Sequence, residues 1–323
     1  MELKKLFAET ETQSAACKKL INAVIDEQSF VETDVLLRTE TALGTAVGEG
    51  VVGGFAAIDG LRTVIFAINP DVLKGSIGRK AADKIVRLVN NAVKTGAPVV
   101  AIIDSQGARF AEGTEAVSGY SSILKAFAEA YGEVPVIIVN KGSNFGMLSY
   151  LSAYCDCCIA YDKSVMASAS PLVLAAKSGV GVEEIGTTAV HVATGLYSFV
   201  VKSDKELKAG ISSILDYLSN PECESTDDPN RVAKKASDMS GIIAETFDKK
   251  TFHEVKTGFG KEVITGFARL NGMAVGVIAG NAAVDDGRLT GEGAVKVTDL
   301  LVTCASFGLP VVNLVDCAGS ALD

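Results

Sequence analysis

The pattern of apolar and polar positions divides the chain into helices and strands that follow one another. Apolar residues recur at helical spacing over Arg79 to Lys94, where Ile85, Leu88 and Val89 share one side of a predicted helix. The uninterrupted apolar run from Val99 to Ile103 then predicts a strand buried on both faces, as in a parallel sheet. A helix followed by a buried strand predicts an α/β fold.

The same reading continues along the chain. It predicts helices at 6–25, 117–131, 147–154 and 241–247, strands at 134–140 and 157–160, and two hairpins, one within 45–69 and one around Asn271 and Gly272. The polar stretch Asn220 to Lys235 contains two prolines and two adjacent aspartates, which is typical of a linker. We therefore expect an N-terminal domain at 1–220, a linker at 221–240 and a C-terminal domain at 241–323.

An internal repeat supports two related domains. An offset of 212 places the pattern Gly54-Phe55-Ala56 on Gly266-Phe267-Ala268 without a gap. The same offset carries GAPVVAIIDSQG, which begins at Gly96, onto GLPVVNLVDCAG, which begins at Gly308. Repeat one continues well past Arg109, whereas repeat two reaches Asp323, so we expect the second domain to be incomplete.

Composition narrows the class of protein. A net charge of −9 and a pI near 5.0 argue against nucleic acid or an anionic membrane as a partner. The apolar runs are too short for a spanning helix, so we expect a cytoplasmic protein without membrane insertion. Seven scattered cysteines favour reduced thiols over a disulfide framework.

Candidate chemistry lies at two strand ends. DSQGARFAEG, Asp104 to Gly113, and NKGSNFG, Asn140 to Gly146, are each predicted to form a glycine-containing turn that follows a strand and leads into a helix. Ligands bind at this edge of open parallel sheets, and free backbone NH groups there can hold a carbonyl oxygen. We therefore expect the NH groups of Gly107 and Gly146 to be free and to point toward one ligand. With only two histidines, His191 and His253, a Ser-His triad or a His-ligated metal has little material, and we predict no metal site.

Several motifs resemble one protein family. DSQGARFAEGTEAVSGY, from Asp104, is similar to the DSGGARxQEGxxSLxGY segment of the carboxyltransferases of biotin-dependent acyl-CoA carboxylases and decarboxylases. GSIGRKAADKI, EEIGTTAVH and ITGFARLNGMAVGVIAGN resemble further segments of that family, in family order. The resemblance implies tandem crotonase-like domains and a homo-oligomer. It also implies that carboxyl groups move between biotin, held on a separate carrier protein or domain, and the α carbon of a short acyl-CoA.

The family mechanism implies site residues. The biotin anion takes the α proton, and backbone NH groups hold the oxygen of the thioester enolate. By counting back from Asp156, the resemblance places the catalytic NH pair on Gly146 and Met147; Met147 stands where the family has glycine, and a side chain there resists positive φ and fills space. The resemblance also implies substrate binding by Gly107, Ala108, Arg109 and Lys296.

Both charged residues also have a non-catalytic interpretation. Arg109 could be a structural arginine held in an ion pair, and Lys296 could be an ordinary charged residue on a helix. By the internal repeat, the counterpart of the Gly146 turn, which would hold biotin, falls near position 358. We therefore expect this chain to be inactive in carboxyl transfer by itself. The expected partners are acyl-CoA, a biotin carboxyl carrier, and biotin carboxylase or decarboxylase subunits.

Two other functions stay open. A biotin-independent crotonase-like enzyme on a CoA thioester would need a side-chain acid or base, for which Glu112, Glu115 and Tyr150 are candidates. A non-catalytic assembly subunit is favoured by Met147 and by the altered second half.

Overall fold

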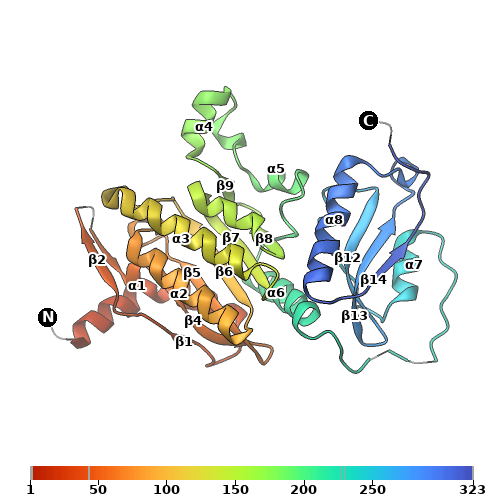
Figure 1. The fold of residues 1–323 in the computed structure, drawn as a ribbon, viewed down its shortest axis with the longest axis horizontal. Coiled ribbons are helices and arrows are strands. Elements are labelled where there is room, and N and C mark those ends of the chain that lie inside the picture. Colours follow the sequence, from red (N-terminus) through yellow and green to blue (C-terminus); the bar gives the residue numbers. More distant parts are fainter. Residues whose placement is uncertain (1–2, 43, 226, 229, 322–323) are drawn as a thin grey trace. The chain divides into compact units, whose positions relative to one another are not determined.

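The computed structural model describes residues 3–42, 44–225, 227–228 and 230–321. Within it the chain forms two compact units (Figure 1). Unit 1 comprises Met1–Val190 with Val200–Ser212, and unit 2 comprises His191–Phe199 with Ser213–Asp323. None of the helices in the described part of the chain is long and apolar enough to cross a membrane.

Helices and strands alternate, as the sequence pattern predicts. The α-helices are α1 Leu3–Val24, α2 Arg79–Thr95, α3 Thr114–Ala130, α4 Pro171–Ser178, α5 Thr188–Ala193, α6 Asp204–Ser219, α7 Met239–Thr246 and α8 Gly291–Ser306. The larger sheet has the order β1-β4-β5-β6-β7-β8-β10, with β9 paired to β7. Its strands are β1 Val31–Glu32, β4 Val51–Ile58, β5 Leu61–Ile68, β6 Val99–Ser105, β7 Val136–Phe145, β8 Cys157–Tyr161, β9 Val165–Ala167 and β10 Phe199–Val201, and a separate hairpin pairs β2 Arg38–Thr41 with β3 Gly44–Val47.

Helices cover both faces of the unit 1 sheet. Phe66 of β5 packs edge-on against Phe127 of α3, so α3 and its neighbour α2 lie on the Phe66 face. Ile102 of β6 points to the opposite face, where it lines a cavity with Cys17 and Leu20 of α1. The central parts of the parallel strands β5, β6 and β7 are therefore buried on both faces, which explains the apolar runs Val64–Ile68, Val99–Ile103 and Val136–Val139.

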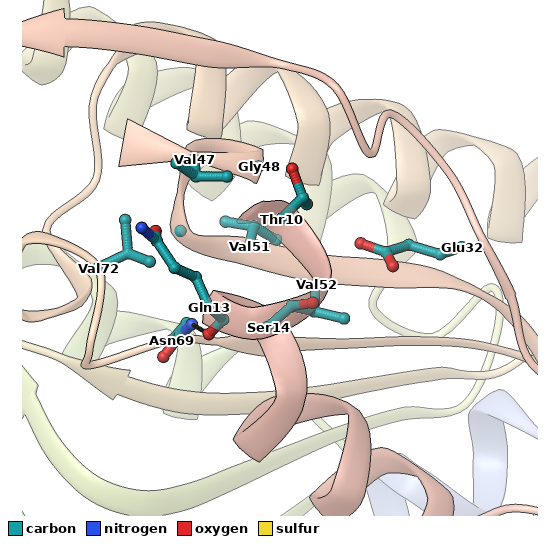
Figure 2. A pocket seen from close by; sticks show the side chains of 11 residues that line it. Thr10, Gln13, Ser14, Glu32, Val47, Gly48, Val51, Val52, Asn69 and Val72 are labelled. Atoms are coloured by element: carbon teal, nitrogen blue, oxygen red, sulfur yellow. Dashed lines mark hydrogen bonds between the residues drawn. The ribbon is translucent and has the colours of Figure 1, made fainter. Parts of the chain in front are cut away.

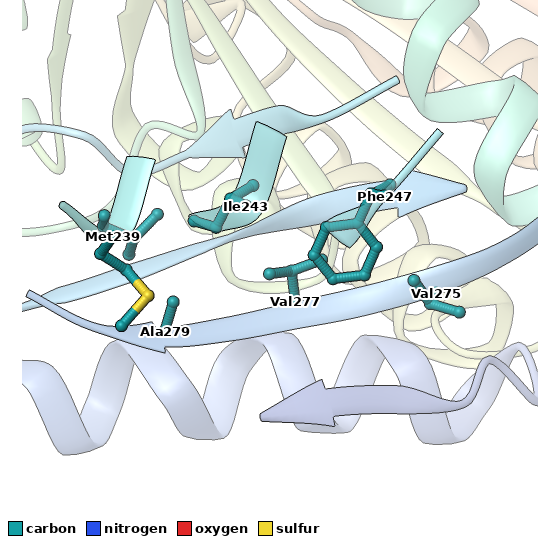
Figure 3. Close-up of a cluster of buried hydrophobic side chains, with 8 residues drawn as sticks. Met239, Ile243, Phe247, Val275, Val277 and Ala279 are labelled. Carbon is teal, nitrogen blue, oxygen red and sulfur yellow. The ribbon is translucent and has the colours of Figure 1, made fainter. Parts of the chain in front are cut away.

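Unit 2 contains a four-stranded sheet with the order β11-β12-β13-β14. Its strands are β11 His253–Val255, β12 Val263–Leu270, β13 Met273–Gly280 and β14 Val311–Leu314. Ile243 and Phe247 of α7 pack on one face of this sheet against Val275 and Val277, while α8 runs along the other face (Figure 3). The hydrophobic core of unit 2 thus lies between α7 and the sheet.

The pairing registers confirm the internal repeat residue by residue. In the first hairpin Val51 pairs with Ile68, and in the second Val263 pairs with Gly280, each shifted by 212. The parallel pair Val64–Val99 recurs as Gly276–Val311. Two crotonase-like units in an α/β chain, the second with the smaller sheet, are therefore confirmed.

Two local predictions differ from the structure. The segment Lys141–Phe145 was expected to form a turn, but it continues β7, because Ser143, Asn144 and Phe145 pair with β9. The following helix is a 3-10 helix, η4 Gly146–Ala153, rather than an α-helix. The pairing with β9 therefore extends β7 by five residues and places Gly146 directly at the strand end.

Candidate functional site

The two predicted glycine turns meet at the carboxyl ends of neighbouring strands. Gly107 follows β6 and Gly146 follows β7, and these strands pair in parallel. A β-carbon on Gly146 would lie 4.0 Å from the Gly107 Cα, and one on Gly107 would lie 3.2 Å from the Phe145 carbonyl oxygen. Both residues have positive φ, which favours glycine, and at Gly107 the close approach of the Phe145 carbonyl also disfavours a side chain.

Gly146 and Met147 open the helix η4. The left-handed φ, +75°, falls on Gly146, and Met147 is not among the residues with positive φ. The strain expected at Met147 is therefore absent, although its half-buried side chain still occupies space there. Since the first NH groups of a helix have no acceptor within it, these two residues present adjacent donors at the strand end.

The NH of Gly107 is hydrogen-bonded within its own loop. It donates to the Ser105 hydroxyl oxygen at 3.1 Å, while that buried hydroxyl donates to the Gly75 carbonyl at 2.7 Å. The Gly107 carbonyl and the Arg109 NH both bond to Ile77. Our expectation of a free Gly107 NH is therefore wrong, because the hydroxyl of Ser105, two residues earlier, accepts its hydrogen bond. Ala108 lies between Gly107 and Arg109 and forms a β-bridge with Ile77.

Arg109 is buried beneath this loop, with 3% of its surface exposed. Its Nη1 lies 2.8 Å from the Glu49 carboxylate, which is fully buried, and 2.9 Å from Glu112. Its Nη2 donates to the Ser76 carbonyl at 3.0 Å. The guanidinium thus ties three chain segments to the glycine loop, and its contacts are structural ones.

Glu112 has a second bond that fixes a helix. Its Oε2 accepts the backbone NH of Arg79 at 2.7 Å, at the first turn of α2. A carboxylate there satisfies an otherwise unpaired donor and complements the helix dipole. Because Arg109 and α2 already bind it, Glu112 is a poor general acid or base.

Glu49 is the residue that sequence reasoning missed. It stands sixty positions before Arg109, and its backbone has φ +60°. Its carboxylate accepts a further hydrogen bond from Thr39 at 2.6 Å. The signal for Glu49 in the sequence is weak: it is one acidic residue between two glycines, Gly48 and Gly50. Two flanking glycines indicate a sharp turn, and an acidic residue in such a turn is the feature that could have identified it.

A cavity of about 280 Å³ lies at the same sheet edge, on the α1 face. Among its lining residues, Asp104 accepts the Ser143 NH at 2.9 Å, and burial raises the pKa of that carboxyl. Lys141 pairs with Asp204 at 3.0 Å, and Asp204 also accepts the Tyr161 hydroxyl at 2.6 Å. These bonds already satisfy several of the polar groups around the cavity.

A second, much smaller cavity lies between α1 and β4. Its volume is about 10 Å³, which is room for one water molecule at most. Figure 2 shows the Asn69 amide donating to the Gln13 carbonyl at its wall, at 2.7 Å. This cavity is too small for any part of a CoA thioester.

Lys296 lies in unit 2 and is 1% exposed. Its ammonium donates to the carbonyls of Val263 at 2.7 Å and Gly260 at 3.3 Å. Lys84 makes the same bonds in unit 1, to Val51 at 2.6 Å and Gly48 at 3.5 Å. The substrate contact predicted for Lys296 stays a prediction, and its observed role is to bridge strand carbonyls.

The sequence that forms β6, β7 and the rest of the chain matches a known protein family. The family model of the carboxyl transferase domain matches residues 14–322. The chain belongs to the carboxyl transferase family. The resemblance drawn from DSQGAR and the accompanying motifs is thereby confirmed.

Similar proteins are, by name, subunits of acyl-CoA carboxylases and decarboxylases. The chain is 32% identical over 322 residues to the methylmalonyl-CoA decarboxylase subunit alpha of Veillonella parvula, covering 92% of this chain and 63% of that one. It is 31% identical to the propionyl-CoA carboxylase carboxyltransferase subunit of Haloferax mediterranei, covering 84% and 57% respectively. The chain thus spans about three fifths of the length of these relatives.

A solved structure shows the same fold. Transcarboxylase 12S, described as a hexamer with hydrolysed methylmalonyl-CoA bound, matches with a TM-score of 0.90 at 26% identity. The match covers 98% of this chain and 68% of that one. Among the described residues, no group of three or more His, Cys, Asp or Glu side chains is arranged to hold a metal ion.

Proposed function

We propose that this chain provides the acyl-CoA half of a carboxyl transfer between biotin and the α carbon of a short acyl-CoA. The observation that carries the proposal is the contact of Gly107 with Gly146 at the ends of β6 and β7. There η4 begins with two backbone donors, from Gly146 and Met147. Loss of the α proton places negative charge on the thioester oxygen, and paired NH groups stabilise that charge.

In this proposal the side chains position the backbone. Arg109, Glu49 and Glu112 fix the loop that carries Gly107 and Ala108. Carboxybiotin, brought by a separate carrier, supplies the carbon dioxide and the base, so no side chain of this chain needs to accept the proton. We assign none of the described residues to biotin.

The partners follow from this division of labour. We propose that the chain works with a biotin carrier and a carboxylase or decarboxylase subunit, as a homo-oligomer in the cytoplasm. The biotin-independent alternative is less well supported, because Glu112 is engaged by Arg109 and Tyr150 is 52% exposed. The boundaries 1–220, 221–240 and 241–323 remain our proposal for the domains.

Met147→Pro tests the donor pair directly. Proline lacks the NH but fits the first turn of a helix, so the substitution removes one donor and little else. Met147→Leu is the matched control. The probe is a CoA thioether that carries a nitronate, which is an analogue of the thioester enolate. Its affinity is measured by calorimetry and compared with that of the same CoA thioether without the nitro group.

We expect Met147→Pro to weaken nitronate binding about tenfold or more and to leave unchanged the binding of the CoA thioether that lacks the nitro group. Met147→Leu should bind both as the wild type does. Equal nitronate affinity in the proline and leucine variants would refute the assignment of the oxyanion donors.

A further inference from the structure

The cavity on the α1 face of unit 1 has no part in the proposed function. It lies between α1 and the carboxyl ends of β5 and β6, and its volume is about 280 Å³. Pockets that bind small molecules begin at about 300 Å³, so this space suits a ligand at the small end of that range. We call it the α1 cavity.

The interior of the α1 cavity is apolar. Ile68 at the end of β5 and Ile102 of β6 line it from the sheet and are 3% and 1% exposed. Cys17 and Leu20 line it from the helix α1. Contact with such a surface favours an apolar group, because that contact removes apolar area from water. The interior therefore suits a short aliphatic chain.

Two ammonium groups of the cavity wall share one carboxylate. Lys141 pairs with Asp204 at 3.0 Å. The hydrogen bond from the Tyr161 hydroxyl lowers the pKa of the Asp204 carboxyl, and the charges of Lys141 and Lys19 lower it further. Lys19 therefore lies near a carboxylate that Lys141 already neutralises, which leaves positive charge on this part of the wall.

Two carboxylates lie near the Cys17 thiol. Burial, followed by the charges of Asp71 and Asp104, raises the pKa of that thiol to about 12. Burial also raises the pKa of the Asp104 carboxyl, and Asp71 adds to this rise while Lys141 opposes it. Asp71 and Asp104 thus lie close to each other, which leaves negative charge on this second part of the wall.

One charge of each sign stays unpaired. Lys19 and Asp71 both line the cavity and are exposed, and none of the ion pairs in the described part of the chain includes either of them. A ligand with a single charge would use only one of these groups and would bring its own charge near the group of like sign. A ligand with both charges is complementary to both.

We propose that the α1 cavity binds a small aliphatic α-amino acid. The carboxylate of the amino acid lies toward Lys19, its ammonium group lies toward Asp71, and its side chain packs on Ile68 and Ile102. The inference does not depend on the proposed function, because the binding measurement below uses no CoA compound and no biotin.

The probe is L-leucine, which is added to the full chain and measured by calorimetry. Two analogues each lack one charge: isocaproate has no ammonium group, and isoamylamine has no carboxylate. The test variants are Asp71→Asn and Lys19→Gln, which remove the two unpaired charges. Their controls are Asp59→Asn at an exposed hairpin turn and Lys5→Gln at an exposed position of α1.

We expect saturable binding of L-leucine with a Kd of about 1 mM or lower. Asp71→Asn and Lys19→Gln should each weaken this binding by about tenfold or more, whereas Asp59→Asn and Lys5→Gln should leave it unchanged. The wild-type chain should bind isocaproate and isoamylamine about tenfold more weakly than L-leucine, or less well still. Circular dichroism checks that all four variants remain folded, as expected for changes at exposed positions.

The proposal fails if L-leucine does not bind saturably, or if the control variants weaken binding as much as the test variants do. Equal binding of isocaproate or isoamylamine would also overturn it, because the cavity would then recognise a single charge. Binding of L-leucine that is unchanged in both Asp71→Asn and Lys19→Gln would place the ligand outside the α1 cavity.

Discussion

Units 1 and 2 share a backbone and differ in how they hold the ends of their strands and helices. A buried lysine bridges strand carbonyls in both, Lys84 in one and Lys296 in the other. An aspartate binds both NH groups of the hairpin turn in both, Asp26 and Asp248. These shared contacts belong to the ββα scaffold, not to a particular site.

The units differ at the start of the helix that follows the hairpin. In unit 1 Glu112 binds the first turn of α2 and is held by Arg109. In unit 2 Glu262, from the start of β12, binds the Thr290 NH and hydroxyl before α8. The carboxylate is retained but comes from a different segment, and in unit 1 that segment is the loop of the candidate site.

The comparison teaches where the chain has specialised. The offset carries Glu49 and Arg109 to Lys261 and Ala321, so unit 2 has no copy of the buried ion pair. The glycine loop itself is repeated, because Gly319 bonds to Leu289 as Gly107 bonds to Ile77. Loop conformation is therefore a scaffold property, and the charged support beneath it is specific to unit 1.

The largest expected effect breaks that support. Arg109→Met leaves the buried Glu49 carboxylate without its partner, and we expect it to destabilise unit 1 by about 3–5 kcal/mol. Arg87→Met removes an exposed pair with Asp34, and we expect a loss of about 0–1 kcal/mol. Hydrogen exchange of amides in β6, across a denaturant series, measures both.

A second-site change sharpens this result. Adding Glu49→Gln to Arg109→Met removes the uncompensated charge and should recover part of the lost stability. If Arg109→Met costs no more than Arg87→Met, the buried ion pair does not support the loop.

The buried lysines test whether the units are equivalent. Lys84→Met and Lys296→Met each leave strand carbonyls unsatisfied, and we expect losses of about 1–3 kcal/mol in their own units at pH 7. Burial lowers the pKa of Lys84 to about 8 and also lowers the pKa of Lys296. Separate hydrogen-exchange measurements on β4 and β12 amides report the two units.

The lowered pKa of Lys84 gives this test a pH dependence. Between pH 8 and its unfolded value of 10.5, the unfolded lysine holds a proton that the folded one has lost, so its contribution to stability rises with pH. The deficit of Lys84→Met relative to wild type should therefore grow from pH 8 to 10. A deficit that shrinks over that range would show that the ammonium form is the one the fold favours.

The smallest effect concerns the hairpin turns. Asp26→Ala removes hydrogen bonds to Asp59 and Gly60, and Asp248→Ala removes those to Asn271 and Gly272. We expect each to cost about 1 kcal/mol, with slightly more for Asp248 because it also accepts from Ser225 at 2.9 Å. Thermal unfolding of the two variants checks this order, and a clear reversal would show that the turns are not equivalent.

Much of the fold could be predicted from the chain. The helix at Arg79–Lys94 and the strand at Val99–Ile103 appear as α2 and β6, because their periodicity directly encodes which faces are buried. The extension of β7 to Phe145 could not be read, since its polar residues are ordered by pairing with β9, about twenty residues further on. The contact of Gly107 with Gly146 was expected, because adjacent parallel strands end at one edge.

By itself, the sequence determined the repeat, the two hairpins and the family, because these depend on local periodicity and on residues in order along the chain. Only the tertiary structure decided which groups meet. It directed the Gly107 NH to Ser105 and paired Arg109 with Glu49. The physical reason is that burial selects hydrogen-bond and charge partners by proximity in space, and proximity in space is set by the packing of the whole unit.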